Sequence, residues 1–238
     1  MLSLILIRHG ESVWNRAQRF TGWADIDLTE VGVAQMQIAG RLLREQGFDV
    51  DLAYTSALWR CIRSQSELLN AMERPDVPTI IDWRLNERHY GALTGMSKLV
   101  VVQQFGADAV HRWRRSYDAE PPQGQGDAAG HRVTDARRAS PIDRVSDGES
   151  LKQVVDRVRP LWRDSIGPDV RAGKRVGVTG HGNSLRALMK LIENISDADI
   201  VSLEIPNAMP VVYELDAALE PVGRFFIGDA ASSASQIL

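Results

Sequence analysis

The stretch "LILIRHGESVWN", residues 4–15, decides the fold of this chain. It begins with a run of leucine and isoleucine, which is typical of a strand buried on both faces of a parallel sheet. The run ends abruptly in Arg8, His9 and Gly10. A strand that serves only the core has no use for a cation and an imidazole at its end. We therefore expect a negatively charged ligand beyond the carboxyl end of this strand.

The rest of the chain alternates short apolar runs with longer helical patterns. We expect strands at 2–7, 51–56, 78–82 and 174–180, and two final strands within 209–215 and 222–228. Helices are expected at 29–47, 57–72, 150–166 and 183–194. This order predicts an α/β fold with a mostly parallel central sheet of about six strands, flanked by helices on both faces. The 238 residues suit a single domain over 1–238.

Two of the expected helices carry signals at their ends. In the helix 29–47, Thr29 can cap the start and Gly47 can end the helix. Ser56 can cap the helix 57–72 in the same way. Helical spacing predicts that the helix 29–47 buries an apolar stripe, which comprises Val31, Ala34, Ile38 and Leu42.

Residues 116–149 differ in composition from the rest, being poor in large apolar side chains and rich in Gly, Pro, Asp and Arg. A loop of that length in a compact domain is usually a lid or a disordered segment. We therefore expect a lid-like polar insertion at about 116–149. The tail from about 229 is expected to be flexible.

Composition excludes several classes of protein. Hydrophobic residues make up 44% and charged residues 25%, with a net charge of −3, so neither a nucleic-acid footprint nor a polybasic membrane patch is expected. The single cysteine, Cys61, rules out an intrachain disulfide and favours a reducing compartment. The apolar start "MLSLILI" lacks a basic region and ends too early, at Arg8, for a signal peptide or a spanning helix. We expect a cytoplasmic protein.

Two of the expected strands end in the same way, with a histidine followed by a glycine. His9 ends the first strand in "LILIRHGES", and His181 ends a later one in "RVGVTGHGNS". Ligands of an open parallel sheet collect at the carboxyl ends of its strands. The pair is therefore more consistent with a shared functional role than with two histidines that each bond only locally. Arg60, in the first turn after the strand 51–56, should lie at the same edge.

Several chemistries for two such histidines are disfavoured. A metal site needs a third ligand at a recognisable spacing, and Arg8 would repel a cation. The nucleophile elbow G-x-S-x-G is absent, and "GHGNSL" (180–185) is a weak match to the dinucleotide fingerprint. Phosphoryl transfer remains, because a neutral imidazole attacks phosphorus while Arg8 and Arg60 hold the phosphoryl oxygens.

Several motifs together resemble one family. They are "RHGES-x-x-N" (8–15), "FTGW" (20–23), "YTS-x-x-x-R" (54–60), "NERHYGALTG" (86–95), "WRR" (113–115) and "GHGNSLRAL" (180–188). In this order they resemble the cofactor-dependent phosphoglycerate mutases of the histidine phosphatase superfamily. The resemblance covers about residues 3–120 and 147–229.

The resemblance implies a role for each matching position. His9 would carry the phosphoryl group, His181 would bind and polarise it, and Glu87 would exchange a proton with the substrate hydroxyl. Other groups would hold the transferred phosphate: Arg8, Arg60, Ser12, Asn15, Gly182 and Asn183. A last set would hold the carboxylate and second phosphate of the substrate: Tyr90, Lys98, Arg114 and Arg115, with Thr21 and Gly22 nearby.

The implied activity is the interconversion of 3-phosphoglycerate and 2-phosphoglycerate in glycolysis and gluconeogenesis, by ping-pong transfer through phospho-His9. In this family 2,3-bisphosphoglycerate serves as the priming cofactor and no metal is used. The expected partners are small phosphoglycerates, not nucleic acids or membranes. By resemblance alone, a homodimer or another homo-oligomer is expected.

Two departures from the family pattern leave an alternative open. The segment 123–147 and the short tail differ from the sequence expected where the family covers its site, and looser closure would admit water. A phosphatase on the same scaffold is therefore the alternative, although Lys98, Arg114 and Arg115 provide a clamp that a simple phosphatase does not need. A non-catalytic phosphate-binding protein is disfavoured, because it predicts loss of His9, Glu87 or His181 and all three are present.

Overall fold

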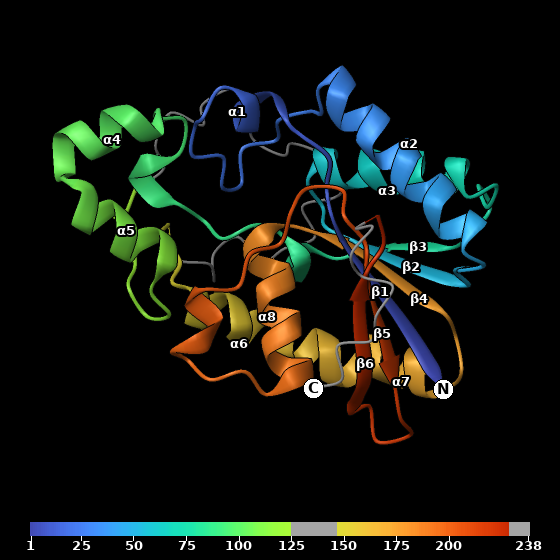
Figure 1. Ribbon diagram of the computed structural model, residues 1–238. Helices are drawn as coiled ribbons and strands as arrows, with labels where there is room; N and C mark the ends of the chain where they lie inside the picture. Colours follow the sequence, from blue (N-terminus) through green and yellow to red (C-terminus); the bar gives the residue numbers. More distant parts are fainter. Residues whose placement is uncertain (125–146, 229–238) are drawn as a thin grey trace.

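A computed structural model of the chain describes residues 1–124 and 147–228. At its centre is a six-stranded sheet with the strand order β3-β2-β4-β1-β5-β6 (Figure 1). The first four of these pair in parallel, whereas β5 is antiparallel to β1 and β6 is antiparallel to β5. The prediction of a mostly parallel sheet of about six strands is confirmed.

The six strands occupy the segments expected from the sequence: β1 (Leu2–Arg8), β2 (Leu52–Thr55), β3 (Thr79–Ile81), β4 (Val176–Gly180), β5 (Val211–Leu215) and β6 (Pro221–Phe226). The α-helices are α1 (Val13–Arg16), α2 (Glu30–Glu45), α3 (Trp59–Ala71), α4 (Lys98–Phe105), α5 (Ala107–Arg115), α6 (Leu151–Leu161), α7 (Gly167–Arg171) and α8 (Gly182–Glu193). The single helix expected at 150–166 is α6 followed by a π-helical turn at Trp162–Ile166, which leads into α7.

The two faces of β1 pack against different helical layers, because successive side chains of a strand point to opposite faces. Leu4 and Leu6 join the core formed with α6, α7 and α8. Ile5 and Ile7 join the core formed with α2 and α3. Figure 1 shows these helical layers on opposite sides of the sheet. The predicted flanking of both faces by helices is confirmed.

The apolar stripe predicted for α2 is wrong at three of its four positions, and only Leu42 packs, partly buried, against the core. Val31 and Ile38 are 48% and 49% exposed, and Ala34 is also exposed. The buried face consists instead of Gly32, Met36, Ala39, Gly40 and Leu43. A Cβ at Gly40 would come within 2.4 Å of the Leu68 carbonyl oxygen on α3. The two glycines let the backbone of α2 contact the backbone of α3 and of the loop after β1, and this close packing decides which side of the helix is buried.

Of the two predicted caps, only the first is confirmed. Thr29 Oγ1 accepts a hydrogen bond from Gly32 N–H at the start of α2 (3.0 Å), and the chain turns away after the helix at Gly47, whose φ is +79°. Ser56 does not cap α3, which begins at Trp59. Its hydroxyl is used in the site described below.

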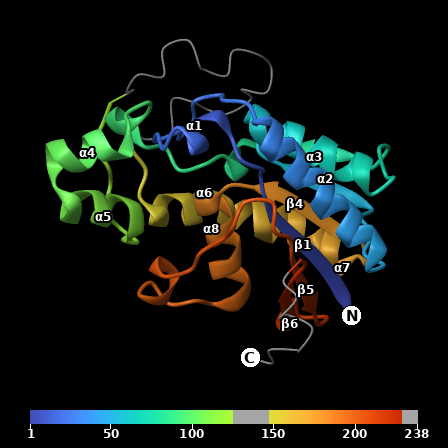
Figure 2. The ribbon, with the colours of Figure 1, turned by 45° about the horizontal axis from the view of Figure 1, so that its top comes forward.

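Helices α4 and α5 lie beside the sheet rather than on one of its faces (Figures 1 and 2). They have a small core of their own, formed by Phe20, Leu93, Val101 and Val110. Lys98 is the first residue of α4, and the basic run 112–115 ends α5. This pair therefore brings cationic side chains toward the edge of the sheet where β1 and β4 end.

Parts of two expectations lie outside the described residues. These are positions 125–146 of the predicted lid-like insertion and the predicted flexible tail from 229. Within the described part of the chain, no helix combines the length and the apolar character needed to cross a membrane.

Candidate active site

The two histidines leave neighbouring strands side by side. Arg8 of β1 pairs in register with Gly180 of β4, and His9 and His181 directly follow these two residues. The His9 N–H donates to the Gly180 carbonyl oxygen (3.1 Å). The two imidazole ring centres are 4.9 Å apart, with an interplanar angle of 63°. Parallel pairing thus brings together two residues that are far apart in the sequence.

The contacts of His9 leave one of its ring nitrogens free to act as a nucleophile. Nδ1 lies 2.7 Å from the Gly10 carbonyl oxygen. Because a carbonyl oxygen only accepts, Nδ1 carries the proton and Nε2 keeps its lone pair. Burial, followed by the charges of Arg60 and Arg8, holds the pKa of His9 well below 6.5. His9 is therefore neutral near pH 7, which is the form that attacks phosphorus.

The tautomer of His181 follows from a chain of hydrogen bonds that runs through Ser56. The Asn86 amide oxygen accepts from the Ala57 N–H (3.0 Å) and from the Ser56 hydroxyl (2.8 Å). Since Ser56 has donated its proton to Asn86, its oxygen accepts from His181 Nε2–H at 2.8 Å. In the neutral ring Nδ1 is then unprotonated. It is buried and has no hydrogen-bond partner among the described residues.

The charge on His181 depends on the cations around it. Burial, followed by Arg60 and His9, holds the pKa of His181 well below 6.5. A bound phosphoryl group would offset the positive charge of Arg60 and so favour protonation of His181. Cys61 also lies beside this ring, with Sγ 3.2 Å from Nε2, and burial raises the pKa of its thiol. Cys61 is therefore a neutral thiol and not a competing nucleophile.

Two arginines flank the histidines, Arg60 buried and Arg8 partly buried. Arg60 is 1% exposed and donates to the carbonyl oxygens of Ala24 (2.8 Å) and Gly22 (2.9 Å), which ties the loop after "FTGW" to α3. Arg8 Nη1 donates to the Ile205 carbonyl oxygen (2.9 Å). Arg8 Nε is buried and has no hydrogen-bond partner in the described part of the chain. That donor is available to an anionic ligand.

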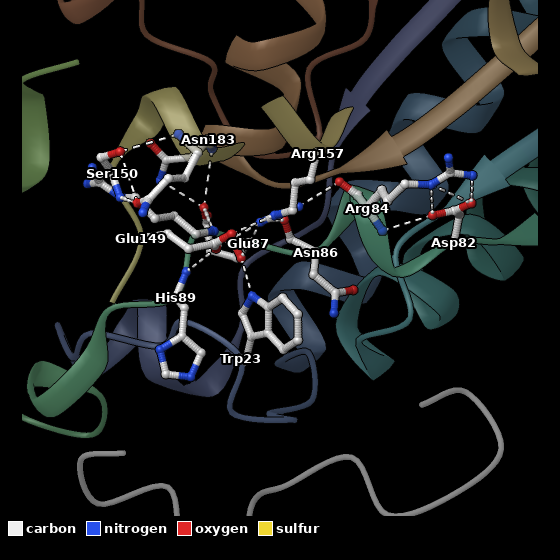
Figure 3. A network of polar contacts seen from close by, with 12 residues as sticks. Trp23, Asp82, Arg84, Asn86, Glu87, His89, Glu149, Ser150, Arg157 and Asn183 are labelled. Carbon is white, nitrogen blue, oxygen red and sulfur yellow. Dashed lines mark hydrogen bonds and ion pairs between the residues drawn. The ribbon is translucent and has the colours of Figure 1, made fainter. Parts of the chain in front are cut away.

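Glu87 lies in the loop that follows β3, next to Asn183 (Figure 3), and it lines the same cavity as His9. Its Oε1 accepts from the Asn183 side-chain amide (2.8 Å) and from the Arg88 N–H (2.7 Å). No described residue donates a hydrogen bond to Oε2, which lies 3.8 Å from the position that a Cβ on Gly182 would take. The carboxylate is 8% exposed and does not pair with Arg84, which binds Asp82 instead. One oxygen of Glu87 is thus anchored and the other is left for proton exchange.

The predicted substrate-holding residues belong to the same cavity, and the cationic ones come from α4 and α5. Tyr90, Lys98, Arg114 and Arg115 all line it. Burial, followed by the charge of Arg114, lowers the pKa of Lys98. Arg115 pairs with Glu204 across the cavity wall. A cluster of like charges of this kind favours a ligand that carries an anionic group there as well.

The cavity measures about 140 Å³, which is small beside the roughly 300–1,000 Å³ of sites for drug-sized ligands. It suits a compact phosphorylated molecule. Most predicted site residues line it: Arg8, His9, Asn15, Thr21, Gly22, Arg60, Glu87, Tyr90, Lys98, Arg114, Arg115, Gly182 and Asn183.

The structure places two predicted residues behind the wall of the cavity. His181 supports the wall from the side of β4. Ser12 is fully buried, and its hydroxyl accepts from the Asn15 N–H (3.2 Å) while Asn15 Oδ1 accepts from the Ser12 N–H (3.2 Å). Ser12 therefore orients the first turn of α1, and Asn15 alone of this pair lines the cavity.

Sequence reasoning missed four lining residues, namely Arg19, Phe20, Arg186 and Glu204. Arg186 could have been found, because it lies one helical turn after Asn183 on α8 and so shares a face with it. Glu204 precedes β5 in a loop without a motif. Only the folded chain brings it to Arg115.

The geometry suits phosphoryl transfer through a histidine. The free Nε2 of His9 can attack, arginine groups can hold the phosphoryl oxygens, and Glu87 can exchange a proton with the oxygen that leaves or enters. Among the described residues, no group of three or more His, Cys, Asp or Glu side chains is placed to hold a metal ion.

Comparisons with known proteins agree with this geometry. The model of the histidine phosphatase superfamily (branch 1) matches residues 4–139 and 125–220. The fold resembles that of a mycobacterial glucosyl-3-phosphoglycerate phosphatase, with 24% identity, 90% of this chain and 93% of the other covered, and a TM-score of 0.69. It also resembles a protein named mycobacterial hydrolase 1 (21% identity, 98% and 99% covered, TM-score 0.72). A putative alpha-ribazole-5'-P phosphatase from Escherichia coli is similar as well, with 19% identity, 91% of this chain and 92% of the other covered, and a TM-score of 0.67.

The family match spans most of the chain, including β1 with His9 and β4 with His181. This chain therefore belongs to branch 1 of the histidine phosphatase superfamily, whose fold supports phosphoryl transfer through a phosphohistidine.

Proposed function

We propose that this chain transfers the phosphoryl group of a small phosphorylated hydroxy acid through His9, and that it is a phosphoglycerate mutase. One observation carries the proposal. One cavity is lined both by His9 and Glu87 and by Lys98 and Arg114, which α4 and α5 contribute. A phosphoglycerate has a phosphate for His9 and a carboxylate for these cations.

In the first step His9 Nε2 attacks one phosphorus atom of 2,3-bisphosphoglycerate, the bond between that phosphorus and its ester oxygen breaks, and a monophosphoglycerate is left. The leaving oxygen takes a proton from Glu87 Oε2, so that a neutral hydroxyl departs. Arg8 and Arg60 hold the phosphoryl oxygens during the transfer. His181, once protonated, donates to the same group.

In the second step a hydroxyl of the bound phosphoglycerate gives its proton to Glu87 and attacks the phosphorus of phospho-His9. The nitrogen–phosphorus bond breaks and the enzyme returns to its starting form. When the attacking hydroxyl is not the one that left, the net reaction interconverts 3-phosphoglycerate and 2-phosphoglycerate. Priming by 2,3-bisphosphoglycerate is part of this proposal. The buried donor at Arg8 Nε and the cations from α4 and α5 suit a ligand of that charge.

Hydrolysis is the second candidate, and the comparisons favour it. Two of the similar structures are named as phosphatases of phosphorylated small molecules. If water attacks phospho-His9 in place of a substrate hydroxyl, the products are inorganic phosphate and free His9. The two activities share every residue discussed above, and they differ only in which nucleophile reaches the phosphorus atom first.

A coupled assay of 3-phosphoglycerate decides between them. We would measure 2-phosphoglycerate and inorganic phosphate together, with and without 2,3-bisphosphoglycerate and with a chelator present. The mutase proposal expects rapid, bisphosphate-stimulated and chelator-resistant formation of 2-phosphoglycerate, lost in His9→Ala and kept in His111→Ala, a matched change at an exposed histidine. Release of phosphate without 2-phosphoglycerate would establish the phosphatase and refute the mutase.

A further inference from the structure

A buried ion pair lies directly behind Glu87. Arg157 on α6 and Glu149 just before α6 contact each other through two hydrogen bonds, Nε to Oε1 (2.7 Å) and Nη2 to Oε2 (3.1 Å). Their side chains are 8% and 3% exposed. Neither lines the cavity that contains His9. A buried pair of this kind is weak evidence for stability, because desolvation offsets much of the attraction between the charges.

This pair binds the backbone of the loop that carries Glu87, as Figure 3 shows. Arg157 donates to three backbone carbonyl oxygens of this loop, those of Arg84 (2.6 Å), Asn86 (3.0 Å) and Glu87 itself (3.0 Å). Glu149 holds the other side of the loop, since its Oε2 accepts from the His89 N–H (2.8 Å) and its N–H donates to the His89 carbonyl oxygen (2.8 Å).

The fork of the guanidinium group makes this arrangement specific. Arg157 uses Nε, Nη1 and Nη2 in different directions, and it joins one carboxylate to three carbonyl oxygens. A lysine has a single ammonium group at the end of a flexible chain and cannot reproduce this geometry. Trp23 adds one more contact, because its Nε1–H donates to the Glu87 carbonyl oxygen (2.5 Å).

The side chain of Glu87 depends on this backbone position. Its Oε1 is anchored to Asn183 on α8, and its Oε2 is left for proton exchange. If the loop moved, Oε2 would no longer stay within hydrogen-bond reach of the ester oxygen of a bound substrate, and proton transfer needs that reach. By contrast, His9, Arg8 and Arg60 are held by β1 and α3 and do not contact the pair.

We propose that Arg157 and Glu149 are positioning residues for the proton-transfer step: they hold the backbone of 84–89 so that Glu87 can protonate the leaving oxygen. This inference rests on the proposed function of Glu87. It predicts a selective defect, because a substrate whose leaving group departs without a proton does not need Glu87.

The test compares two phosphoryl donors in the first step alone. 2,3-Bisphosphoglycerate, the priming donor of the proposed function, has an alkoxide leaving group, which needs a proton, whereas acetyl phosphate releases acetate, which does not. We would measure acid-labile phosphate on the protein by rapid quench, with His9→Ala as the blank. The variants are Arg157→Lys and Glu149→Gln. Arg84→Lys serves as the matched control, because among the described residues that side chain forms hydrogen bonds to Asp82 alone, and the change leaves the carbonyl oxygen of residue 84 in place.

With 2,3-bisphosphoglycerate we expect Arg157→Lys to slow phosphoryl transfer to His9 at least about tenfold, as part of the roughly 10²–10⁴-fold effect of general acid catalysis. With acetyl phosphate its rate should stay within about twofold of the wild type, and Arg84→Lys should leave both rates unchanged. Glu149→Gln should show the same selectivity and decides the matter if Arg157→Lys does not fold. Equal losses with both donors, or no loss with either, would overturn the inference while the proposed function stands. If the wild type forms no phospho-His9 from either donor, the proposed function itself fails and the inference falls with it.

Discussion

The close approach of α2 to the loop after β1 makes Gly32 the position where a single methyl group should disable the site. A Cβ at Gly32 would lie 2.1 Å from the Glu11 carbonyl oxygen and 2.8 Å from the Glu11 nitrogen. Both atoms belong to the backbone two residues after His9. Neither can swing aside as the end of a side chain could. The substitution Gly32→Ala must therefore move α2, the loop, or both.

The size of the movement follows from the contact. Non-bonded carbon atoms essentially never approach an oxygen within 3.0 Å, so the gap must widen by about 1 Å. Thr29 ties the start of α2 to the same loop, with its N–H donating to the Glu11 carbonyl oxygen (2.9 Å), so the displacement is passed on toward His9. A misplacement of about 1 Å costs roughly 10²-fold in rate. Overpacking of this kind costs about 1–3 kcal/mol of stability.

We therefore expect Gly32→Ala to lower kcat about 100-fold and the free energy of unfolding by about 1–3 kcal/mol. The assays are the formation of 2-phosphoglycerate or phosphate, and urea unfolding followed by circular dichroism. Gly47→Ala is the matched control: its φ is +79° and, within the described structure, a Cβ there meets nothing within 4 Å. It should cost about 1–2 kcal/mol of stability through backbone strain and leave kcat unchanged. A Gly32→Ala enzyme with kcat within threefold of the wild type would refute the reasoning.

Three further changes test separate parts of the structure. His9 and His181 are neutral when folded, because burial and then Arg60 lower their pKa values, whereas the unfolded chain takes up protons below pH 6.5. The free energy of unfolding should thus fall as the pH drops below 6.5, by up to about 1.4 kcal/mol per pH unit for each histidine, and His9→Ala should reduce the slope in urea titrations. Arg60→Lys loses the paired hydrogen bonds to two backbone carbonyl oxygens. Titration calorimetry should then show that inorganic phosphate binds about tenfold more weakly. An unchanged affinity would contradict the role of Arg60 in holding the phosphoryl oxygens. Thr29→Ala should lower the free energy of unfolding by about 1 kcal/mol, whereas Ser97→Ala, at a helix start where the described structure shows no side-chain cap, should not.

The effects of substitutions on stability and activity should therefore separate the residues that hold the two histidines from the residues that hold Glu87. Contacts within the sheet set the distance between His9 and His181, because Arg8 pairs in parallel with Gly180. Among the described residues, the loop 84–89 reaches His181 only through the hydrogen bond from Ser56 to Asn86. Contacts from α6 hold Glu87. Damage to the first group of residues should affect every phosphoryl donor, whereas damage to the second group should affect only donors with poor leaving groups.

The strands could be predicted from the sequence because their signal is local. The run 4–7 is apolar without interruption, which specifies burial on both faces, and the same holds for 176–178 in β4. The pairing of His9 with His181 followed from one general rule, that ligands collect at the carboxyl ends of parallel strands. For Lys98, Arg114 and Glu87, the resemblance to the family supplied the prediction, and the structure places all three at one cavity.

What the sequence alone determined was the order and kind of the elements and the location of the chemistry at one edge of the sheet, because periodicity and strand ends are properties of short segments. Only the tertiary structure decided which face of α2 is buried, since Gly32 and Gly40 gain backbone contacts that hydrophobic spacing does not register. It also assigned the Ser56 hydroxyl to His181 instead of to a helix cap, and it placed Arg157 behind Glu87. These are contacts between residues some 70 to 125 positions apart, and their geometry exists only once the layers have packed.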